Sequence, residues 1–240
     1  MFSKRILKRL HSKITKEHIQ GLRTLLQPTQ VLEGDIEKYT TDWQGQTKAK
    51  GSVVLFPKST EDVSNILGFC NKNDLAVVMQ GGNTSLVAGA TPKDEEIVMS
   101  SEKMRSFIEF DENLEVLSCD AGYTLQEIQE YLSTFGYITP YDLGARGSCV
   151  IGGNLATMAG GINFVKYGNL RSYVLGLEVV TGEGKTLNMR SKIRKDNTGT
   201  DLKQLFVGSE GTLGVITRVD LLVKREDKEN KTLFIKTGSY

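Results

Sequence analysis

The chain has 240 residues, 39% of them hydrophobic and 25% charged, which is long enough for one large or two small hydrophobic cores. Its 30 Lys and Arg residues balance 29 Asp and Glu residues, and a net charge of +1 creates no global field favouring nucleic acid. No stretch approaches the roughly 20 apolar residues of a membrane-spanning helix. Three cysteines without a C-x-x-C pair argue against a disulfide framework or a metal site. We expect a globular protein of a reducing compartment, with no nucleic-acid partner and no transmembrane segment.

The amino terminus is basic. Its first 16 residues, MFSKRILKRLHSKITK, contain no acidic residue, and apolar side chains recur at near-helical intervals. This composition is typical of a mitochondrial targeting segment rather than a secretory signal. We therefore expect residues 1–20 to direct the protein to the mitochondrial matrix, and a solvated basic first helix is the alternative.

An α/β unit is expected after a lead-in at residues 21–46. SVVLFP predicts a short strand ended by Pro57, and Ser59 with Asp62 predicts the start of a helix. Val63, Ile66, Leu67 and Cys70 fall on one face of that helix. LAVVM at 75–79 and EEIVMS at 95–100 then read as two further strands, so that strand, helix and strands form a small α/β unit.

A second unit is expected from about residue 106. LEVLSCDAG predicts a strand, and Thr124 with Glu127 forms a capping box for a helix whose buried face includes Leu132 and Phe135. YVLGLEVVT, GEG and KTLNMR read as a hairpin, and GVITRVDLLV as a last strand. The boundary between the units lies near residue 105, and the charged run opening residues 227–240 is typical of an interdomain linker.

Three glycine-rich segments are the main functional signal. MQGGNTSLVAG at 79–89 follows a strand directly, so successive N–H groups with no Cβ in the way could bind a pyrophosphate, although a plain turn explains Gly-Gly-Asn equally well. It lacks the G-x-G-x-x-G and P-loop spacings. LGARGSCVIGGNLATMAGG at 143–161 and VGSEGTLGVIT at 207–217 also permit close approach of backbone to a ligand. Three such segments together favour an extended cofactor.

The order of these segments resembles a known family. QGGNTSLVAG, then GARGSCVIGGNLATMAGG with KYGNLRSYVLGLEVV, then RKDNTGTDLKQLFVGSEGTLGVIT resemble the FAD-binding half of the D-2-hydroxyglutarate dehydrogenase family, in the vanillyl-alcohol oxidase/PCMH-type flavoprotein superfamily. The resemblance implies an α+β, PCMH-type FAD-binding fold at residues 47–226. Its two α/β subdomains would span about 47–105 and 106–226, without the carboxyl-terminal substrate domain of the family, and 227–240 would form a linker or truncated tail.

The resemblance also implies a cofactor site. Residues 80–85 would wrap the FAD pyrophosphate, and the 140–161 and 210–216 regions would line the rest of the cofactor. The implied cofactor-binding residues are Gln80, Gly81, Gly82, Asn83, Thr84, Ser85, Pro140, Gly147, Ser148, Gly152, Gly153, Asn154, Thr157, Gly160, Gly161, Glu210, Gly214 and Ile216. The chain departs from the family pattern at Met79, where proline is usual, at Ser85 and Ala88, where glycine is usual, and at Met158, where asparagine is common.

The chemistry implied is hydride transfer from C2 of a 2-hydroxy acid to FAD, with an electron-transfer flavoprotein as acceptor. The only histidines, His11 and His18, lie in or beside the basic terminus, so we expect no imidazole base and no histidyl-linked flavin. FAD is therefore expected to be non-covalent, with Cys149 as a neutral contact. The family's metal and substrate ligands would lie in the missing carboxyl-terminal domain.

We expect this chain to be incomplete for oxidation of D-2-hydroxyglutarate to 2-oxoglutarate by itself, and we assign it no catalytic residue. Two alternatives to this interpretation remain open. The first is a non-catalytic FAD-binding module that needs a partner chain. The second is the FAD half of a D-lactate dehydrogenase, since relatives with other substrates share this half.

Overall fold

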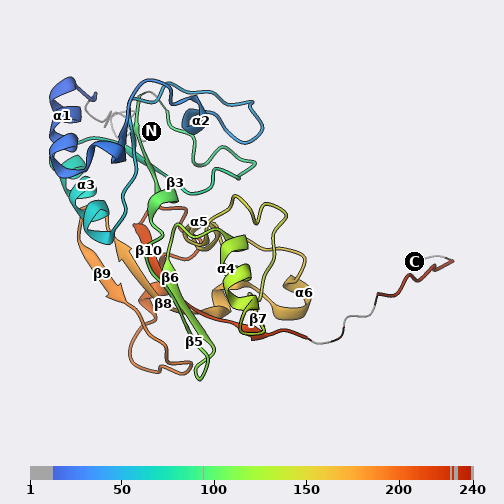
Figure 1. Ribbon diagram of the computed structural model, residues 1–240. Helices are drawn as coiled ribbons and strands as arrows, with labels where there is room; N and C mark the ends of the chain where they lie inside the picture. Colours follow the sequence, from blue (N-terminus) through green and yellow to red (C-terminus); the bar gives the residue numbers. More distant parts are fainter. Residues whose placement is uncertain (1–12, 94, 228, 230–231, 239–240) are drawn as a thin grey trace, which may run out of the picture.

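The computed structural model describes residues 13–93, 95–227, 229 and 232–238. The expected targeting segment spans residues 1–20; its residues 1–12 lie outside the described residues, and its residues 16–20 form the start of the first helix. The described part consists of two subdomains, which we call the first and the second layer, and each is built on its own main sheet with the helices that cover it (Figure 1). None of the described helices is long and apolar enough to cross a membrane.

The first layer is a four-stranded sheet covered by helices. Its strands are β1 (Val31–Leu32), β2 (Val54–Leu55), β4 (Ile97–Ser100) and β3 (Val77–Gln80), in that order. β2 and β3 pair in parallel with β4, and β1 pairs antiparallel with β2. Helices α1 (Lys16–Leu25) and α3 (Thr60–Lys72) pack on this sheet, while α2 (Glu37–Thr40) lies above it. Residues 21–46, expected as a lead-in, thus supply the second half of α1 together with α2 and β1.

Helix α3 forms as its sequence predicts. The Ser59 hydroxyl accepts a hydrogen bond from the Asp62 backbone N–H at 3.1 Å, which satisfies one free donor of the first turn. The predicted stripe of Val63, Ile66, Leu67 and Cys70 is buried against the sheet. The preceding strand is shorter than expected, because only Val54 and Leu55 of SVVLFP pair in the sheet.

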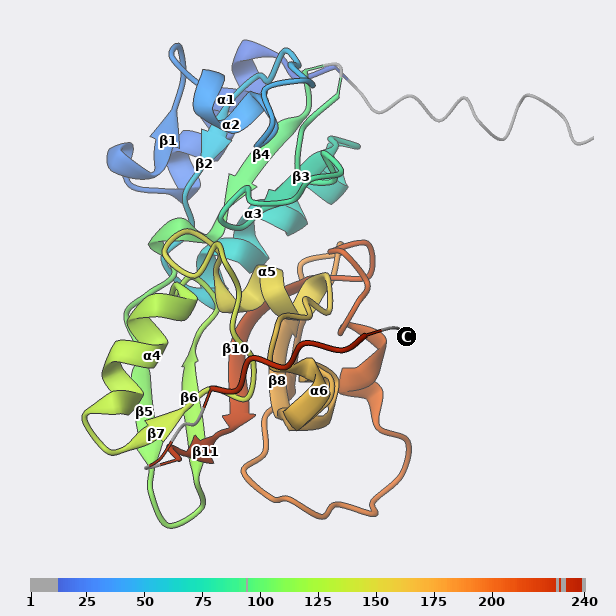
Figure 2. The same ribbon diagram turned by 90° about the vertical axis from the view of Figure 1, so that its right-hand side faces the viewer.

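The second layer is an antiparallel sheet in the order β5-β6-β10-β8-β9. Its strands are β5 (Ile108–Asp111), β6 (Val116–Asp120), β10 (Val215–Leu222), β8 (Val174–Val180) and β9 (Thr186–Met189). Helices α4 (Leu125–Ser133) and α5 (Ile151–Ala156) cover one face, and α6 (Phe164–Tyr167) lies beside them (Figure 2). β7 (Tyr137–Ile138) pairs with β11 (Lys224–Arg225) in a separate two-stranded sheet.

Short 3-10 turns connect elements in both layers. They are η2 (Pro28–Gln30), η3 (Ser101–Lys103), η4 (Leu170–Tyr173) and η5 (Leu202–Leu205).

The capping box at Thr124 and Glu127 and the β8–β9 hairpin form as predicted. One side chain differs from the expectation. Phe135 was expected on the buried face of α4, but the helix ends at Ser133 and Phe135 is 43% exposed. It packs instead against the rings of Phe110 and Tyr131. The buried face of α4 therefore comes from Leu125, Ile128 and Leu132.

Contacts between the layers hold them together. Val180 and Val215 of the second sheet belong to the core of the first layer. The Thr60 hydroxyl donates to the Glu178 carboxylate, and the Ser64 hydroxyl donates to the Gly184 carbonyl at 2.5 Å. The predicted boundary near residue 105 falls between η3 and β5.

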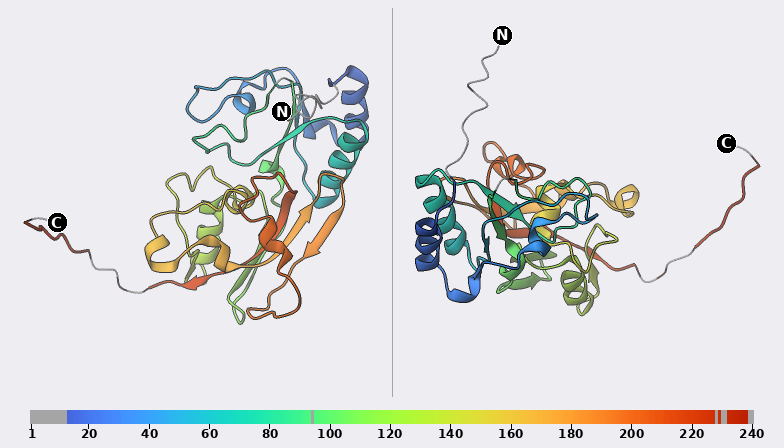
Figure 3. Two further views of the ribbon diagram at one scale, coloured as in Figure 1. Left: turned by 180° about the vertical axis from the view of Figure 1, so that it is seen from behind. Right: turned by 90° about the horizontal axis from the view of Figure 1, so that it is seen from above.

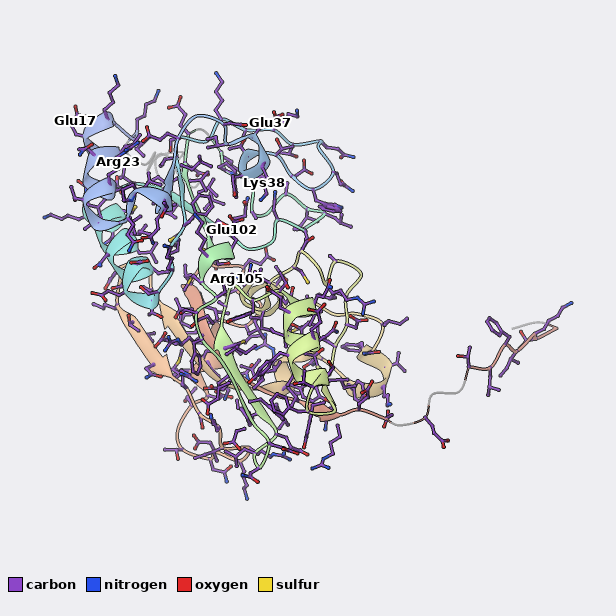
Figure 4. All side chains as sticks on the ribbon, in the orientation of Figure 1. Glu17, Arg23, Glu37, Lys38, Glu102 and Arg105 are labelled. Carbon is purple, nitrogen blue, oxygen red and sulfur yellow. The ribbon has the colours of Figure 1, made fainter. Side chains whose placement is uncertain are left out.

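Charged side chains also meet where the layers join. The Tyr39 hydroxyl donates to the Glu102 carboxylate at 3.1 Å, and the Lys38 ammonium lies 3.7 Å from the same group (Figure 4). Arg105 pairs with Glu127 of α4. Residues 232–238, in contrast, extend away from both sheets (Figure 3).

Candidate functional site

The candidate site is a cavity of about 610 Å³ between the two layers. Its walls come from the loop that follows β3, from α5 with the loop before it, and from the loop that leads into β10. These are the three glycine-rich segments, at residues 79–89, 143–161 and 207–217, which are far apart in the chain. The volume lies in the range of about 300–1,000 Å³ common for small-molecule and cofactor sites.

The first wall offers a run of backbone donors. Within the described part of the chain, the N–H groups of residues 81–85 have no hydrogen-bond acceptor. Asn83 has φ +50°, in the left-handed region, so this loop curls rather than continuing the strand. Successive free N–H groups in such a loop form an anion-binding concavity, or nest. The first wall therefore suits a phosphate or pyrophosphate.

Gly82 permits the first and second walls to touch. A Cβ atom at Gly82 would lie 1.9 Å from the Ser148 carbonyl oxygen and 2.9 Å from the Cys149 Cα. A Cβ at Gly152 would lie 2.7 Å from the Ala121 Cβ. These glycines are therefore required by close backbone packing, which brings the segments around one cavity.

The third wall is fixed to the end of α5. The Gly208 N–H donates to the Leu155 carbonyl at 3.0 Å, and the Glu210 N–H donates to the Ala156 carbonyl at 2.8 Å. Glu210 has φ +52° and carries the one charged side chain among the described lining residues. Because no cation lines the described cavity, a bound pyrophosphate would depend on backbone N–H groups. The Glu210 carboxylate suits hydroxyl or amino donors instead.

The structure brings most of the predicted site residues to this cavity. Those that line it are Gly81, Gly82, Asn83, Thr84, Ser85, Gly152, Gly153, Asn154, Thr157, Gly160, Glu210, Gly214 and Ile216. Those that do not line it are Gln80, Pro140, Gly147, Ser148 and Gly161. Their assignment to FAD remains a prediction.

Physical reasons account for the residues outside the lining. The Gln80 amide is buried and donates to the carbonyls of Tyr39 and Ala90, both at 3.0 Å. Ser148 supports Gly82 through its carbonyl, and Gly161 packs on the Asp142 carbonyl, where a Cβ would lie 1.7 Å away. Pro140 is buried, and Gly147 faces Gln126. They act on the cavity through the backbone around it.

The Asn83 side chain forms a hydrogen bond within the protein. Its amide donates to the Thr41 carbonyl at 2.8 Å, so it ties the first wall to the segment after α2. The sequence analysis also missed apolar lining residues, and Leu86, Val87 and Val150 are examples. Leu86 and Val87 are 62% and 81% exposed, and two adjacent apolar residues within the first glycine-rich segment were the available signal.

Charged side chains near the glycine-rich segments are paired elsewhere and do not line the cavity. Arg146 pairs with Asp142, Lys166 pairs with Asp227, and the Arg171 guanidinium donates to the carbonyls of Gln204 and Val207. His18 belongs to the capping box of α1. Among the residues that the structure describes, no group of three His, Cys, Asp or Glu side chains could hold a metal ion. The described lining therefore offers backbone N–H groups and uncharged polar side chains rather than cations.

Comparison with known proteins agrees with this site. Residues 51–190 match the model of the FAD-binding domain family, and the match covers more than half of the chain. The chain therefore belongs to the FAD-binding domain family. The walls fit this cofactor, because a pyrophosphate needs donors such as the free N–H groups of residues 81–85, and a large planar ligand needs walls that lack Cβ atoms.

Its relatives include named dehydrogenases. The chain is 46% identical over 230 residues to the mitochondrial D-2-hydroxyglutarate dehydrogenase of Danio rerio, covering 95% of this chain and 43% of that protein. It is 42% identical to the Arabidopsis thaliana protein of the same name, covering 96% and 42%. A putative mitochondrial D-lactate dehydrogenase of Schizosaccharomyces pombe is 38% identical, with 96% and 45% covered. The chain spans less than half the length of these curated relatives.

The fold is also known from solved structures. An alkyldihydroxyacetonephosphate synthase superposes with a TM-score of 0.79 at 22% identity, covering 90% of this chain and 41% of that one. The expected α+β, PCMH-type FAD-binding fold is confirmed, as is the resemblance to the D-2-hydroxyglutarate dehydrogenase family. FAD as the cofactor of this domain is confirmed at the level of the family.

One departure from the family pattern gives a testable prediction. Ala88 stands where glycine is usual and has φ +53°, a conformation that costs an L-residue about 1–2 kcal/mol. Replacing Ala88 by Gly should raise the free energy of unfolding by about 1 kcal/mol in urea titrations. Ala90→Gly is the control: Ala90 has no positive φ, so this change should lower stability by about 0.4–1 kcal/mol. Equal losses in both variants would show that Ala88 is not strained.

Proposed function

We propose that this chain is the FAD-holding part of a mitochondrial dehydrogenase that oxidises D-2-hydroxyglutarate to 2-oxoglutarate. The observation that carries the proposal is the cavity between the layers, with its run of acceptor-free N–H groups at residues 81–85. The family match and the relatives named D-2-hydroxyglutarate dehydrogenase supply the substrate class. Bound FAD would supply the two-electron acceptor for oxidation of the hydroxyl-bearing carbon.

Different residues of the chain would hold different parts of the cofactor. The N–H groups of residues 81–85 bind the pyrophosphate, and Glu210 accepts hydrogen bonds from hydroxyl or amino groups. Leu86, Val87 and Ile216 line the cavity and would contribute apolar contacts to the cofactor. Asn83 and Gln80 keep the first wall in place through the carbonyls of Thr41, Tyr39 and Ala90.

Cations for the substrate do not line the described cavity. Two carboxylates of a 2-hydroxydicarboxylic acid need cations, yet the described lining contains no Lys, Arg or His, and its one carboxylate is that of Glu210. We propose that a substrate domain provides these groups, together with any metal ion, and that an electron-transfer flavoprotein accepts the electrons in the mitochondrial matrix. The exposed apolar side chains of Ile162, Phe164 and Val165, 53–96% exposed beside Gly160, suit contact with such a domain.

The proposal is tested by turnover of D-2-hydroxyglutarate with an artificial electron acceptor. The purified chain should carry flavin yet show no turnover above free FAD, and D-lactate should give the same result. Turnover by the chain alone would show that its own residues supply the base and the cations. Co-purification of a second polypeptide that restores turnover would favour the module with a partner chain, and restored oxidation of D-lactate alone would favour the lactate branch.

The flavin should be held without a covalent bond. Cys149 is 3% exposed, and burial raises the pKa of its thiol, so it is a poor nucleophile. Burial likewise raises the pKa of Cys70 to about 12 and that of Cys119 above its usual range. Acid precipitation should therefore release all flavin into the supernatant, and a thiol reagent should modify none of the three cysteines in the folded protein. Flavin retained in the pellet would instead indicate a covalent link.

A further inference from the structure

Three buried polar side chains meet in the second wall of the cavity. The Asn154 amide nitrogen lies 3.2 Å from the Tyr141 hydroxyl oxygen and 3.6 Å from the Cys149 sulfur. Tyr141 and Cys149 are 3% exposed, and Asn154 is 4% exposed. Such a polar cluster is stable in an apolar wall only when its donors and acceptors are satisfied.

The backbone fixes each member of this cluster. The Tyr141 carbonyl accepts from the Thr139 hydroxyl at 2.8 Å, the Cys149 N–H donates to the Ala145 carbonyl at 2.8 Å, and the Asn154 N–H donates to the Val150 carbonyl at 2.9 Å. Asn154 lies on α5, while Tyr141 and Cys149 come from the loop before it. The carboxamide of Asn154 is therefore oriented by groups that cannot move freely.

One atom of the cluster is left for a ligand. The amide N–H groups of Asn154 are directed to the sulfur and to the phenol, whereas no donor within the described residues reaches its Oδ1 atom. Oδ1 is not fully buried in the wall, although it has no hydrogen-bond partner among the described residues. Asn154 and Cys149 line the cavity, and Tyr141 lies behind them.

We propose that Tyr141 is a positioning residue, which orients the Asn154 amide so that its Oδ1 atom accepts a hydrogen bond from an N–H group of the bound cofactor. This inference rests on the proposed FAD site. FAD carries two groups of this chemistry, the imide N–H of its isoalloxazine ring and the amino group of its adenine. Because the phenol does not line the cavity, it acts on the cofactor through Asn154.

The test is the Tyr141→Phe variant, which removes one oxygen and keeps the ring. The Kd for FAD, measured by titration of the flavin-free protein, should rise about threefold to tenfold, the loss expected for one misaligned hydrogen bond. Tyr137→Phe is the matched control, because the Tyr137 hydroxyl is equally buried and has no hydrogen-bond partner. It should leave FAD affinity and the visible spectrum unchanged.

Two further measurements identify the source of the N–H group. If the isoalloxazine donates, Tyr141→Phe shifts the visible spectrum and reduction potential of the flavin and weakens FMN, which lacks adenine, by the same factor as FAD. If the adenine donates, only FAD weakens and the spectrum is unchanged. Either result supports the role of Tyr141.

A double-mutant cycle with Asn154→Ala adds a second check. If Tyr141 acts through Asn154, the double variant should bind FAD no more weakly than Asn154→Ala alone. Wild-type FAD affinity and spectrum in Tyr141→Phe, even with a lowered melting temperature, would overturn the inference and leave only a packing role. A wild-type chain that binds no FAD would overturn the proposed site itself, which is a distinguishable result.

Discussion

Gly82→Ala should raise the Kd for FAD by about 100-fold or more. The added methyl group would lie 1.9 Å from the Ser148 carbonyl oxygen and 2.7 Å from its carbonyl carbon, both of which belong to backbone. A flexible side chain could turn away, but here a loop must move, which costs at least about 3 kcal/mol. The loops that would separate are the first and second walls of the cavity, so the free N–H groups of residues 81–85 would lose their arrangement.

The measurement is an equilibrium titration of the variant with FAD, followed by flavin fluorescence. Gly182→Ala is the control, because a Cβ there meets nothing within 4 Å and Gly182 does not line the cavity. This control should bind FAD as the wild type does. If Gly82→Ala also bound FAD with wild-type affinity, the contact between the two walls would not be needed for the site.

Arg190→Met should lower the free energy of unfolding by about 3 kcal/mol. The Asp220 side chain is 1% exposed, and the Arg190 guanidinium binds both of its oxygens, at 2.6 and 3.2 Å. Removing one partner of a buried ion pair costs about 3–5 kcal/mol, because the remaining charge stays buried. Hydrogen bonds from the Ser118 hydroxyl and the Ser191 N–H would still reach Asp220, so we expect the lower end of that range.

Urea denaturation checks this value, and the melting temperature should fall by roughly 6–12 °C for a chain of this size. Lys48→Met is the control, since Lys48 and Glu37 form an ion pair in which both side chains are more than 60% exposed. Such exposed pairs contribute little to stability, because water and salt screen them. A loss for Arg190→Met no larger than that of the control would contradict the account of the second sheet.

Local rules predicted much of this fold. The helix starts at Ser59 and Thr124 depend on residues three positions apart, and the buried stripe of α3 depends on spacing along one helix. The hairpin of β8 and β9 depends on a short turn. Such signals lie within a few residues of one another, so the sequence contains them before any tertiary contact forms.

Contacts between distant segments could not be predicted in this way. Asp220 and Ser118 are 102 positions apart, and in the sequence Asp220 looks like a solvated charge in an alternating strand. The Gln80 amide donates to the Tyr39 carbonyl, 41 positions away, a contact that no local pattern indicates. Phe135 followed the helical spacing, yet α4 ends two residues before it. In each case tertiary structure decided where the side chain went.

The family resemblance predicted the site residues more directly than the hydrophobic periodicity of the sequence did. The glycine-rich segments marked the three walls, because close backbone packing excludes any other residue at Gly82 and Gly152. Residues such as Tyr141, which act from behind the wall, had no signal in the sequence. Their role depends on a hydrogen bond that only the folded chain creates.

Binding of FAD in the cavity between the two layers is tested most directly by a visible absorbance spectrum. The spectrum is recorded on the purified protein after FAD has been added and unbound cofactor has been removed. We expect flavin bands that remain with the protein in the wild type and in Gly182→Ala, and that are lost in Gly82→Ala. A folded wild-type chain that retains no flavin would contradict this expectation.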